Sequence, residues 1–184
     1  MTDTKLNYIA GDWVSGPATI ANINPSDLSD TIGHFAQASG EQLDQALAAA
    51  RQAQAEWAAY GLERKQNVLM AIGTEMMARA EELGTLLSRE EGKPLAEGKG
   101  EVYRAGQFFT YYAAEVLRQI GDTADSVRDG VEVDVRREPV GVVAIISPWN
   151  FPTATASWTS PRGCSTWSWG RVAASASGWW KAPP

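Results

Sequence analysis

An apolar run in the second half of the chain, residues 140–146 with the sequence VGVVAII, places the tightest limit on the fold. A run of this length without polar alternation is typical of a strand that is buried on both faces, as in a parallel α/β sheet. The loop sequence SPWNFP, residues 147–152, follows it directly. Because ligands of open α/β sheets bind beyond the carboxyl ends of the strands, this loop is a candidate binding site.

The residues before this run have a different period. Val131, Val133 and Val135 alternate with charged residues, which predicts a strand with one covered face and one face in water. Asp129 and Gly130 form a dipeptide that favours a hairpin turn. The sequence therefore predicts a hairpin strand ahead of the buried strand.

The N-terminal part of the sequence predicts two extended segments, residues 8–16 and 18–27, and three helices. Ser39 and Gln42 have the spacing of a capping box that begins the first helix. The second helix is expected between Gly61 and Gly92, and the third before Gly121. Apolar residues at helical spacing are expected to face a core under the strand at 140–146: Leu43, Ala46, Leu47, Ala50, Ala53 and Trp57; Leu69, Ile72, Met76, Leu83 and Leu87; Val102, Ala105, Phe109, Tyr112 and Val116.

Composition excludes several classes of protein. A formal net charge of −6 argues against a nucleic-acid partner or an anionic membrane surface. The sequence has no secretory signal at its start and no run near the roughly 20 apolar residues that span a bilayer, so we expect a cytoplasmic protein with no membrane partner. One cysteine, Cys164, and one histidine, His34, leave no recognisable ligand set, so no metal site is expected.

The composition changes beyond residue 154. Every Asp and Glu lies at or before Glu138, whereas five of the eight tryptophans lie between Trp158 and Trp180. This last segment has no Leu or Ile, and its large apolar residues follow no period. We therefore expect residues 155–184 to form an aberrant, unstructured tail.

Three stretches of the sequence resemble the aldehyde dehydrogenase superfamily. The segment EPVGVVAIISPWNFP, residues 138–152, is similar to the one that carries the family's Pro-Trp-Asn-Phe-Pro motif. The resemblance extends to REEGKPLAEGKGEV, residues 89–102, and to NYIAGDWVSG and NINPSD near the N-terminus, so that it covers about residues 7–154. Within the superfamily, the stretches YIAGDWV, NPSDLSD and SREEGKPLAEGKGEV look most like bacterial 2-oxoglutarate semialdehyde (2,5-dioxopentanoate) dehydrogenases.

The resemblance implies an α/β fold. Residues 1–154 are expected to form a partial N-terminal and NAD(P)-binding domain, made of helices, an oligomerisation hairpin and the first strand of a Rossmann-like sheet that stays incomplete. The family's catalytic domain is expected to be absent from these 184 residues. Glu90, Gly92 and Lys93 match the family's Glu-x-Gly-Lys, which we interpret as a helix end with a solvated ion pair.

The resemblance also assigns site residues. Asn150 matches the asparagine whose side-chain amide holds the thiohemiacetal oxyanion, a role that suits a rigid neutral donor. Four residues match the strand end that lies along NAD or NADP: Ile146, Ser147, Pro148 and Trp149. From the residues alone, an alternative is that Trp149 and the next aromatic residue belong to the core and that Asn150 caps a turn.

The implied activity is NAD(P)-dependent oxidation of an aldehyde, here a semialdehyde, to a carboxylate through a cysteine thiohemiacetal. The family's nucleophile and general base lie downstream of the Asn150 motif, and Cys164 matches no family motif, so we expect an inactive fragment. The alternative is a non-catalytic chain that pairs with an intact paralogue, or with another copy of itself, through the exposed edge of the strand at 131–135.

The tail has an interpretation at the level of the gene. Residues 161–170, PRGCSTWSWG, can be encoded so that a shifted reading frame gives Ala-Gly-Val-Phe-Asn-Leu-Val-Met-Gly, which resembles a downstream family segment. We interpret the chain as the product of a gene that lost an internal stretch and is then read out of frame.

Overall fold

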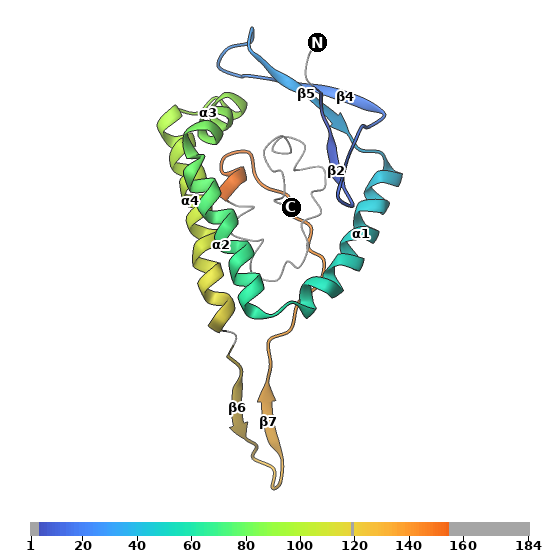
Figure 1. Ribbon diagram of the computed structural model, residues 1–184, viewed down its shortest axis with the longest axis vertical. Helices are drawn as coiled ribbons and strands as arrows, with labels where there is room; N and C mark the ends of the chain where they lie inside the picture. The colour runs from blue at the N-terminus through green and yellow to red at the C-terminus, as the bar shows by residue number, and fades with distance from the viewer. Residues whose placement is uncertain (1–3, 119, 155–184) are drawn as a thin grey trace.

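The computed structural model describes residues 4–118 and 120–154, which form four helices and three small β-sheets (Figure 1). The elements in chain order are β1 (Thr4–Lys5), β2 (Asn7–Ile9), β3 (Asp12–Val14), β4 (Ala18–Ile23), β5 (Thr31–Gln37), α1 (Gly40–Ala59), α2 (Leu62–Ala78), α3 (Ala80–Glu91), α4 (Leu95–Glu115), a short 3-10 helix η1 (Val116–Arg118), β6 (Asp122–Asp125) and β7 (Glu132–Val135). In Figure 1 α2, α3 and α4 pack together on one side, α1 stands on the other, and the β6–β7 hairpin projects at the end opposite β4 and β5. None of the described helices is long and apolar enough to cross a membrane.

The predicted extended segments form strands. β4 and β5 pair antiparallel, and β1 adds to β5 in parallel, so the strand order of this sheet is β1-β5-β4. β2 and β3 form a separate hairpin whose turn is made by Ala10 and Gly11, with φ of 54° and 95°. Two consecutive residues with positive φ match the right-handed twist of the paired strands, and this explains the tight connection.

The predicted capping box at the start of α1 is confirmed. The Ser39 hydroxyl accepts the Gln42 N–H at 3.1 Å, and the Gln42 side chain accepts the Ser39 N–H at 3.0 Å. Only Ala46 and Ala50 of the expected inward face are fully buried, whereas Leu43 is 47 % exposed. The reason is that α1 contacts β2 and stands apart from the α2–α4 group, so its apolar face is only partly covered.

The prediction of one helix between Gly61 and Gly92 is wrong, because the chain forms α2 and α3 with a break at Arg79. Arg79 has φ −98° and ψ 16°, outside the helical region, and its backbone N–H bonds to the Glu75 carbonyl. Its guanidinium bonds to the Glu75 carboxylate at 3.2 Å and to Glu82 at 2.9 and 2.8 Å, one partner on each side of the break. This break lets α3 lie against the first turns of α4 while α2 packs against the rest of that helix.

The core lies along α4, where the expected inward residues Val102, Ala105, Phe109 and Tyr112 are buried. Leu69, Phe109 and Ala113 form one buried cluster between α2 and α4. Leu83, Leu87 and Val102 form a second cluster between α3 and α4. Both clusters use α4 as one wall, so this helix holds the other two together.

Two pairs of glycines bring the helix backbones into contact. A Cβ atom on Gly73 would lie 2.6 Å from the Gly106 carbonyl oxygen, and one on Gly106 would lie 2.7 Å from the Gly73 oxygen. Between α3 and α4, a Cβ on Gly98 would lie 2.6 Å from the Gly84 oxygen. Real Cβ atoms do not approach a carbonyl oxygen this closely, so these positions require the absence of a side chain.

The end of α3 is fixed to the loop between β4 and β5. As predicted, the helix stops at Gly92, which takes the left-handed conformation with φ 74°. The Ser26 hydroxyl donates to the Gly92 carbonyl at 3.2 Å, and Arg89 forms a fork to both carboxylate oxygens of Asp30, at 2.8 and 2.5 Å. Hydrogen bonds from Arg89 and then from the Asn24 amide hold the pKa of Asp30 at about 2.

Glu90 faces the end of β4 from α3. The Asn22 amide donates to its carboxylate at 2.8 Å. Burial and the neighbouring charge of Glu91 raise the pKa of Glu90 to about 8, against the smaller opposing effect of the Asn22 hydrogen bond. The expectation of a solvated pair is therefore wrong for Glu90.

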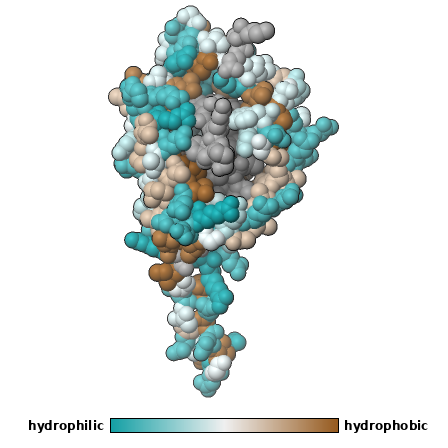
Figure 2. Space-filling model, in the orientation of Figure 1, coloured by the Kyte–Doolittle hydropathy of each residue, from teal (hydrophilic) through white to brown (hydrophobic). Residues whose placement is uncertain are grey.

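The predicted hairpin forms, with Asp122 opposite Val135 and Asp125 opposite Glu132, and with Gly130 at φ 73° in its turn. The expectation of one covered face is wrong within this chain, because every residue of β6 and β7 is exposed. In the space-filling view the hairpin projects from the main body and carries apolar residues on its surface (Figure 2).

The prediction of a buried strand at residues 140–146 is also wrong. This segment is irregular apart from an isolated bridge at Gly141, and Val140 and Ile146 are 77 % and 84 % exposed. The expected packing of the helices on this strand is absent for the same reason. A strand buried on both faces needs neighbours on its edges and layers on its faces, and the described residues supply neither.

Adding a methyl group between α2 and α4 should destabilise the fold. We expect Gly106→Ala to lower the free energy of unfolding by about 1–3 kcal/mol, because the Gly73 backbone cannot move away without opening the core. Gly100→Ala in the same helix is the matched control, because a Cβ there meets nothing within 4 Å. It should raise stability by about 1 kcal/mol through helix propensity. Urea unfolding followed by circular dichroism measures both, and equal effects of the two variants would contradict the close-contact account.

Glu90 should make the chain less stable as the pH rises. Its folded-state pKa of about 8 lies above the ordinary glutamate pKa of 4.5, so its contribution to stability is fully present below pH 4.5 and is lost as the pH rises through about 8. Glu90→Gln keeps the acceptor for Asn22 and removes the charge. It should stabilise the chain by on the order of a few kcal/mol at pH 8.5 and have little effect at pH 4.5.

Thermal unfolding at the two pH values tests this prediction. Glu97→Gln, at an exposed position in the first turn of α4, is the control for the loss of one negative charge. A Glu90→Gln effect that is the same at both pH values would refute the burial of this carboxyl.

Candidate functional site

The loop of residues 147–152 reaches the end of α3 and the start of α4. From β7 the chain runs back along the molecule to this point, shown in orange in Figure 1. The Lys93 ammonium donates to the Asn150 carbonyl at 3.0 Å. The Glu101 carboxylate accepts the backbone N–H groups of Thr153 and Ala154, at 2.9 and 3.2 Å. The loop is therefore held by hydrogen bonds to its backbone.

A turn of helix begins where the loop ends, at residues 152–154. Pro152 occupies the first helical position, where proline fits because its missing N–H would have no partner inside the helix. The next two N–H groups, of Thr153 and Ala154, also have no carbonyl one turn earlier, and Glu101 accepts both. A carboxylate from α4 thus caps a helical turn that is remote in sequence.

Lys93 lies between two carboxylates. Its ammonium is 2.5 Å from Glu91 and 2.5 Å from Glu101, and these side chains are only 13 % and 2 % exposed, against 12 % for Lys93. Burial lowers the pKa of Lys93, but its hydrogen bonds to Glu101 and Glu91 together outweigh burial, and the net pKa is raised. The expectation of a solvated pair is therefore wrong for Lys93 as well. The ammonium also lies 5.2 Å from the centre of the Phe151 ring.

Glu91 is a buried carboxylate of this group whose hydrogen bonding is incomplete. Burial raises the pKa of Glu91, the hydrogen bond and charge of Lys93 oppose that rise, and the charge of Glu101 adds to it. Among the described residues, its Oε1 atom is buried without a hydrogen-bond partner. One ammonium thus serves two carboxylates, and the negative charge is concentrated beside the loop.

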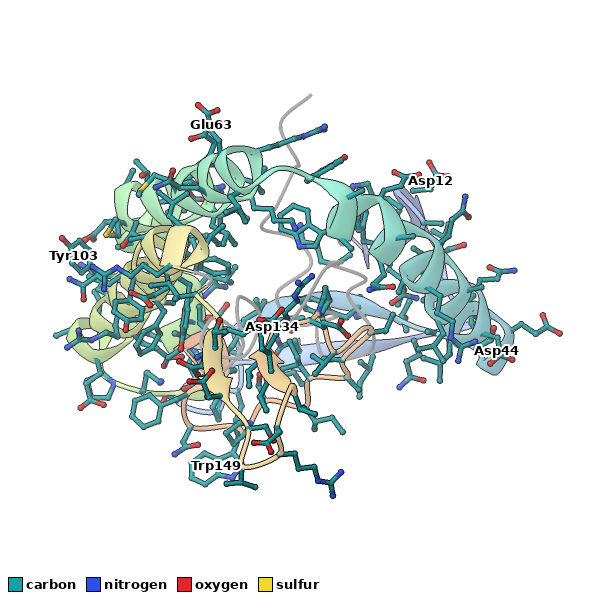
Figure 3. All side chains as sticks on the ribbon, turned by 90° about the horizontal axis from the view of Figure 1, so that it is seen from below. Asp12, Asp44, Glu63, Tyr103, Asp134 and Trp149 are labelled. Atoms are coloured by element: carbon teal, nitrogen blue, oxygen red, sulfur yellow. The ribbon has the colours of Figure 1, made fainter. Side chains whose placement is uncertain are left out.

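The residues expected to form the site differ in exposure. Asn150 is exposed, and Trp149 is 85 % exposed, with its indole at the edge of the molecule in Figure 3. Phe151 is 56 % exposed, so the alternative that the two loop aromatics belong to the core is wrong. Ser147 is half-buried, and its hydroxyl has no partner among the described residues.

Sequence reasoning missed Glu101, which anchors the turn after the loop, and Glu91, which shares the Lys93 ammonium with it. A signal for Glu101 was present, because it shares the inward face of α4 with Gly98, Val102 and Ala105 at helical spacing. A carboxylate on a buried helix face needs a partner, which predicts a polar contact at that position. The described residues contain no group of three or more His, Cys, Asp or Glu side chains placed to hold a metal ion. Cys164 lies outside the described residues.

Comparisons with known proteins agree with the fold. The sequence profile described as "Aldehyde dehydrogenase family" matches residues 13–163. The "Alpha-ketoglutaric semialdehyde dehydrogenase" of Bacillus subtilis is 37 % identical over 159 residues, which cover 85 % of this chain and 32 % of that protein.

Solved structures of two enzymes resemble the chain closely. An aldehyde dehydrogenase from Brucella melitensis biovar abortus superposes with a TM-score of 0.82 at 31 % identity, over 89 % of this chain and 34 % of that one. A betaine aldehyde dehydrogenase from Staphylococcus aureus in complex with NAD+ gives 0.80 at 30 % identity, over 88 % and 33 %. The chain spans about a third of the length of these relatives. The chain has the α/β fold of these enzymes, and its own sheets are small and incomplete. It belongs to the aldehyde dehydrogenase family.

Proposed function

We propose that the chain is the N-terminal part of an NAD(P)-dependent aldehyde dehydrogenase that acts on a semialdehyde, and that Asn150 is its oxyanion donor. The observation that carries this proposal is that the loop presents Asn150 to solvent on a backbone that is held in place. Its backbone is fixed by Lys93 and Glu101, while the Asn150 side chain is exposed. The name of the Bacillus subtilis relative supports a semialdehyde as the substrate class.

The chemistry of Asn150 suits the proposed role. A side-chain amide donates a hydrogen bond without a charge and without a proton that it can lose near neutral pH. A donor held in place before the reaction costs no reorganisation when negative charge develops on the substrate oxygen. Asn150 would therefore favour the tetrahedral oxyanion over the planar aldehyde.

The end of the segment before Asn150 has properties that fit a dinucleotide. Ile146 and Trp149 present exposed apolar surface, and the Ser147 hydroxyl between them lacks a partner among the described residues. We propose that Ile146, Ser147, Pro148 and Trp149 lie along NAD or NADP. The cofactor, when bound, supplies the hydride acceptor, and these residues would orient it and exclude water from one side.

We further propose that these 184 residues do not oxidise aldehydes by themselves. Covalent aldehyde oxidation needs an activated cysteine and a general base for the thioester. The only cysteine is Cys164, in a segment without any acidic residue or histidine that could act as a base. The proposed division is a partial N-terminal and cofactor domain, residues 1–154, followed by a tail that we interpret as out of frame.

The purified chain should show no NAD(P)H absorbance increase with 2-oxoglutarate semialdehyde, succinate semialdehyde or a simple aliphatic aldehyde. Asn150→Ala and Cys164→Ser should leave that result unchanged. Turnover that is lost in Cys164→Ser would refute the proposed inactivity. Sequencing the locus tests the frame interpretation, since an alternative frame without family sequence would exclude it.

If the downstream frame is restored, the resulting enzyme tests the role of Asn150 directly. Asn150→Ala should lower kcat about 100-fold or more, because one oxyanion donor is lost. Asn150→Asp is the matched control, since it keeps the size and replaces the donor by a repelling charge, so it should be at least as slow. An unchanged kcat in Asn150→Ala would remove the oxyanion role.

A second proposal is that the β6–β7 hairpin pairs with another copy of this chain or with an intact family member. The observation that favours it is the exposure of Val131, Val133 and Val135, at 47 %, 43 % and 50 %, on a hairpin that projects from the body (Figures 1 and 2). Alternating valines beside an open strand edge are suited to adding strands from a partner.

Light scattering of the chain alone and mixed with a family member measures this pairing. Val133→Lys should abolish a dimer or mixed complex, because the charge would enter the paired face. Val127→Lys is the control in the same hairpin, since Val127 is fully exposed in the connection outside both strands. A wild-type chain that stays monomeric alone and forms no complex with the family member would contradict the pairing.

A further inference from the structure

We infer that Glu101 and Lys93 are positioning residues for Asn150, which fix the backbone at the Asn150 carbonyl and in the turn that follows it. The inference deepens the proposed function and rests on it in one respect, the oxyanion role of Asn150. Neither residue is proposed to touch substrate. Each acts through a hydrogen bond to the backbone of the loop or of the turn that follows it.

The hydrogen bonds fall at the two ends of a short stretch. Lys93 holds the Asn150 carbonyl at 3.0 Å, and Glu101 holds the Thr153 and Ala154 N–H groups at 2.9 and 3.2 Å. Between these points lies Pro152, whose ring fixes φ near −65°. Few backbone rotations therefore remain free in the stretch that follows Asn150.

The Glu101 carboxylate supplies a cap that the local sequence lacks. The residue that precedes the helical turn is Phe151, which has no side-chain acceptor for the first free N–H groups. Glu101 accepts two of them with one oxygen, and its negative charge also suits the positive end of a helical turn. Its Oε2 atom remains bound to Lys93, so the same carboxylate links both anchors.

The number of N–H donors on Lys93 equals the number of acceptors around it, and its charge is opposite to that of its two carboxylate partners. An ammonium has three N–H donors, and Lys93 meets three acceptors: Glu91, Glu101 and the Asn150 carbonyl. Apolar side chains would fill this space without the cost of removing three charged groups from water. Apolar side chains would not donate a hydrogen bond to the carbonyl or accept hydrogen bonds from the two N–H groups. These directional bonds are what fixes the backbone.

The geometry connects these anchors to the exposed side of the loop. Because the Asn150 carbonyl is held toward Lys93, the orientation of its peptide plane is fixed. The Asn150 residue itself remains exposed. Losing either anchor should therefore free the asparagine without removing any atom of it.

Amide hydrogen exchange of the isotopically labelled 184-residue chain, read by NMR, tests the Glu101 anchor. In Glu101→Ala, protection of the Thr153 and Ala154 amides should fall by about tenfold to a hundredfold, as for loss of a hydrogen bond to a charged group. Glu101→Gln keeps an acceptor at the same reach and should restore most of that protection. Glu101→Asp keeps the charge but shortens the side chain, and it should restore less than Gln.

The carbonyl carbon resonance of Asn150 tests the Lys93 anchor. Lys93→Met removes the donor and keeps the length of the side chain, so this resonance should shift. Lys99→Met is the matched control, because Lys99 forms an ion pair with Glu81 across the α3–α4 contact and none with the loop among the described residues. It should leave the Asn150 resonance and the Thr153 and Ala154 protection unchanged.

Two amides in the core separate local from global effects. Phe109 and Ala113 are buried in α4, so their exchange reports general loss of structure. The inference would be overturned if the Thr153 and Ala154 amides lost protection only in proportion to those of Phe109 and Ala113. It would also be overturned if the Thr153 and Ala154 amides had no protection in the wild-type chain. A Lys99→Met effect equal to that of Lys93→Met would overturn it as well. None of these measurements uses an aldehyde or a cofactor, so failure of the oxyanion role would appear separately, in the kcat of Asn150→Ala.

Discussion

Backbone contact between α4 and its two neighbours is the constraint on which the described structure depends. Gly73 and Gly106 bring α2 against α4, and Gly84 and Gly98 bring α3 against it. Gly98 lies one turn before Glu101 on the same buried face, so the contact that brings α3 close also sets where the Glu101 carboxylate lies. The loop with the candidate site is attached at this junction, and its position follows from how closely two helices can approach.

Two adjacent carboxylates at the end of α3 contact different parts of the molecule. Glu90 points to β4, where Asn22 is its partner, and Glu91 points to Lys93 beside the candidate loop. Both carboxyls have raised pKa values because both are removed from water, and the charge of Glu91 adds to the cost of ionising Glu90. The charge of Glu91, beside the loop with Asn150, therefore affects the protonation of Glu90 beside β4.

Local rules predicted local features well. The capping box of Ser39 and Gln42, the helix end at Gly92 and the hairpin turn at Gly130 each depend on a few neighbouring residues, and all three are present. The break at Arg79 was not predicted, because the apolar period continues through it and the reason for the break is the packing of α3 on α4.

Features that depend on distant partners were predicted less well. The apolar run at 140–146 indicates a segment suited to burial, but burial of a strand depends on neighbouring strands that its own sequence does not specify. The loop sequence pointed to Asn150, whereas its anchors lie about 50 residues earlier in the chain, where only the inward position of Glu101 gave a signal. Assigning a carboxylate to a buried face would have predicted a contact, although not its partner.

The exposed run at residues 140–146 has a consequence for the fate of the chain in a cell. It combines branched apolar side chains with backbone groups that lack the regular partners of a sheet. Such a segment is what chaperones and proteases bind in incompletely folded proteins, and mass action then draws the chain toward them. While no strand covers this run, the abundance of the protein would be set by quality control as much as by its synthesis.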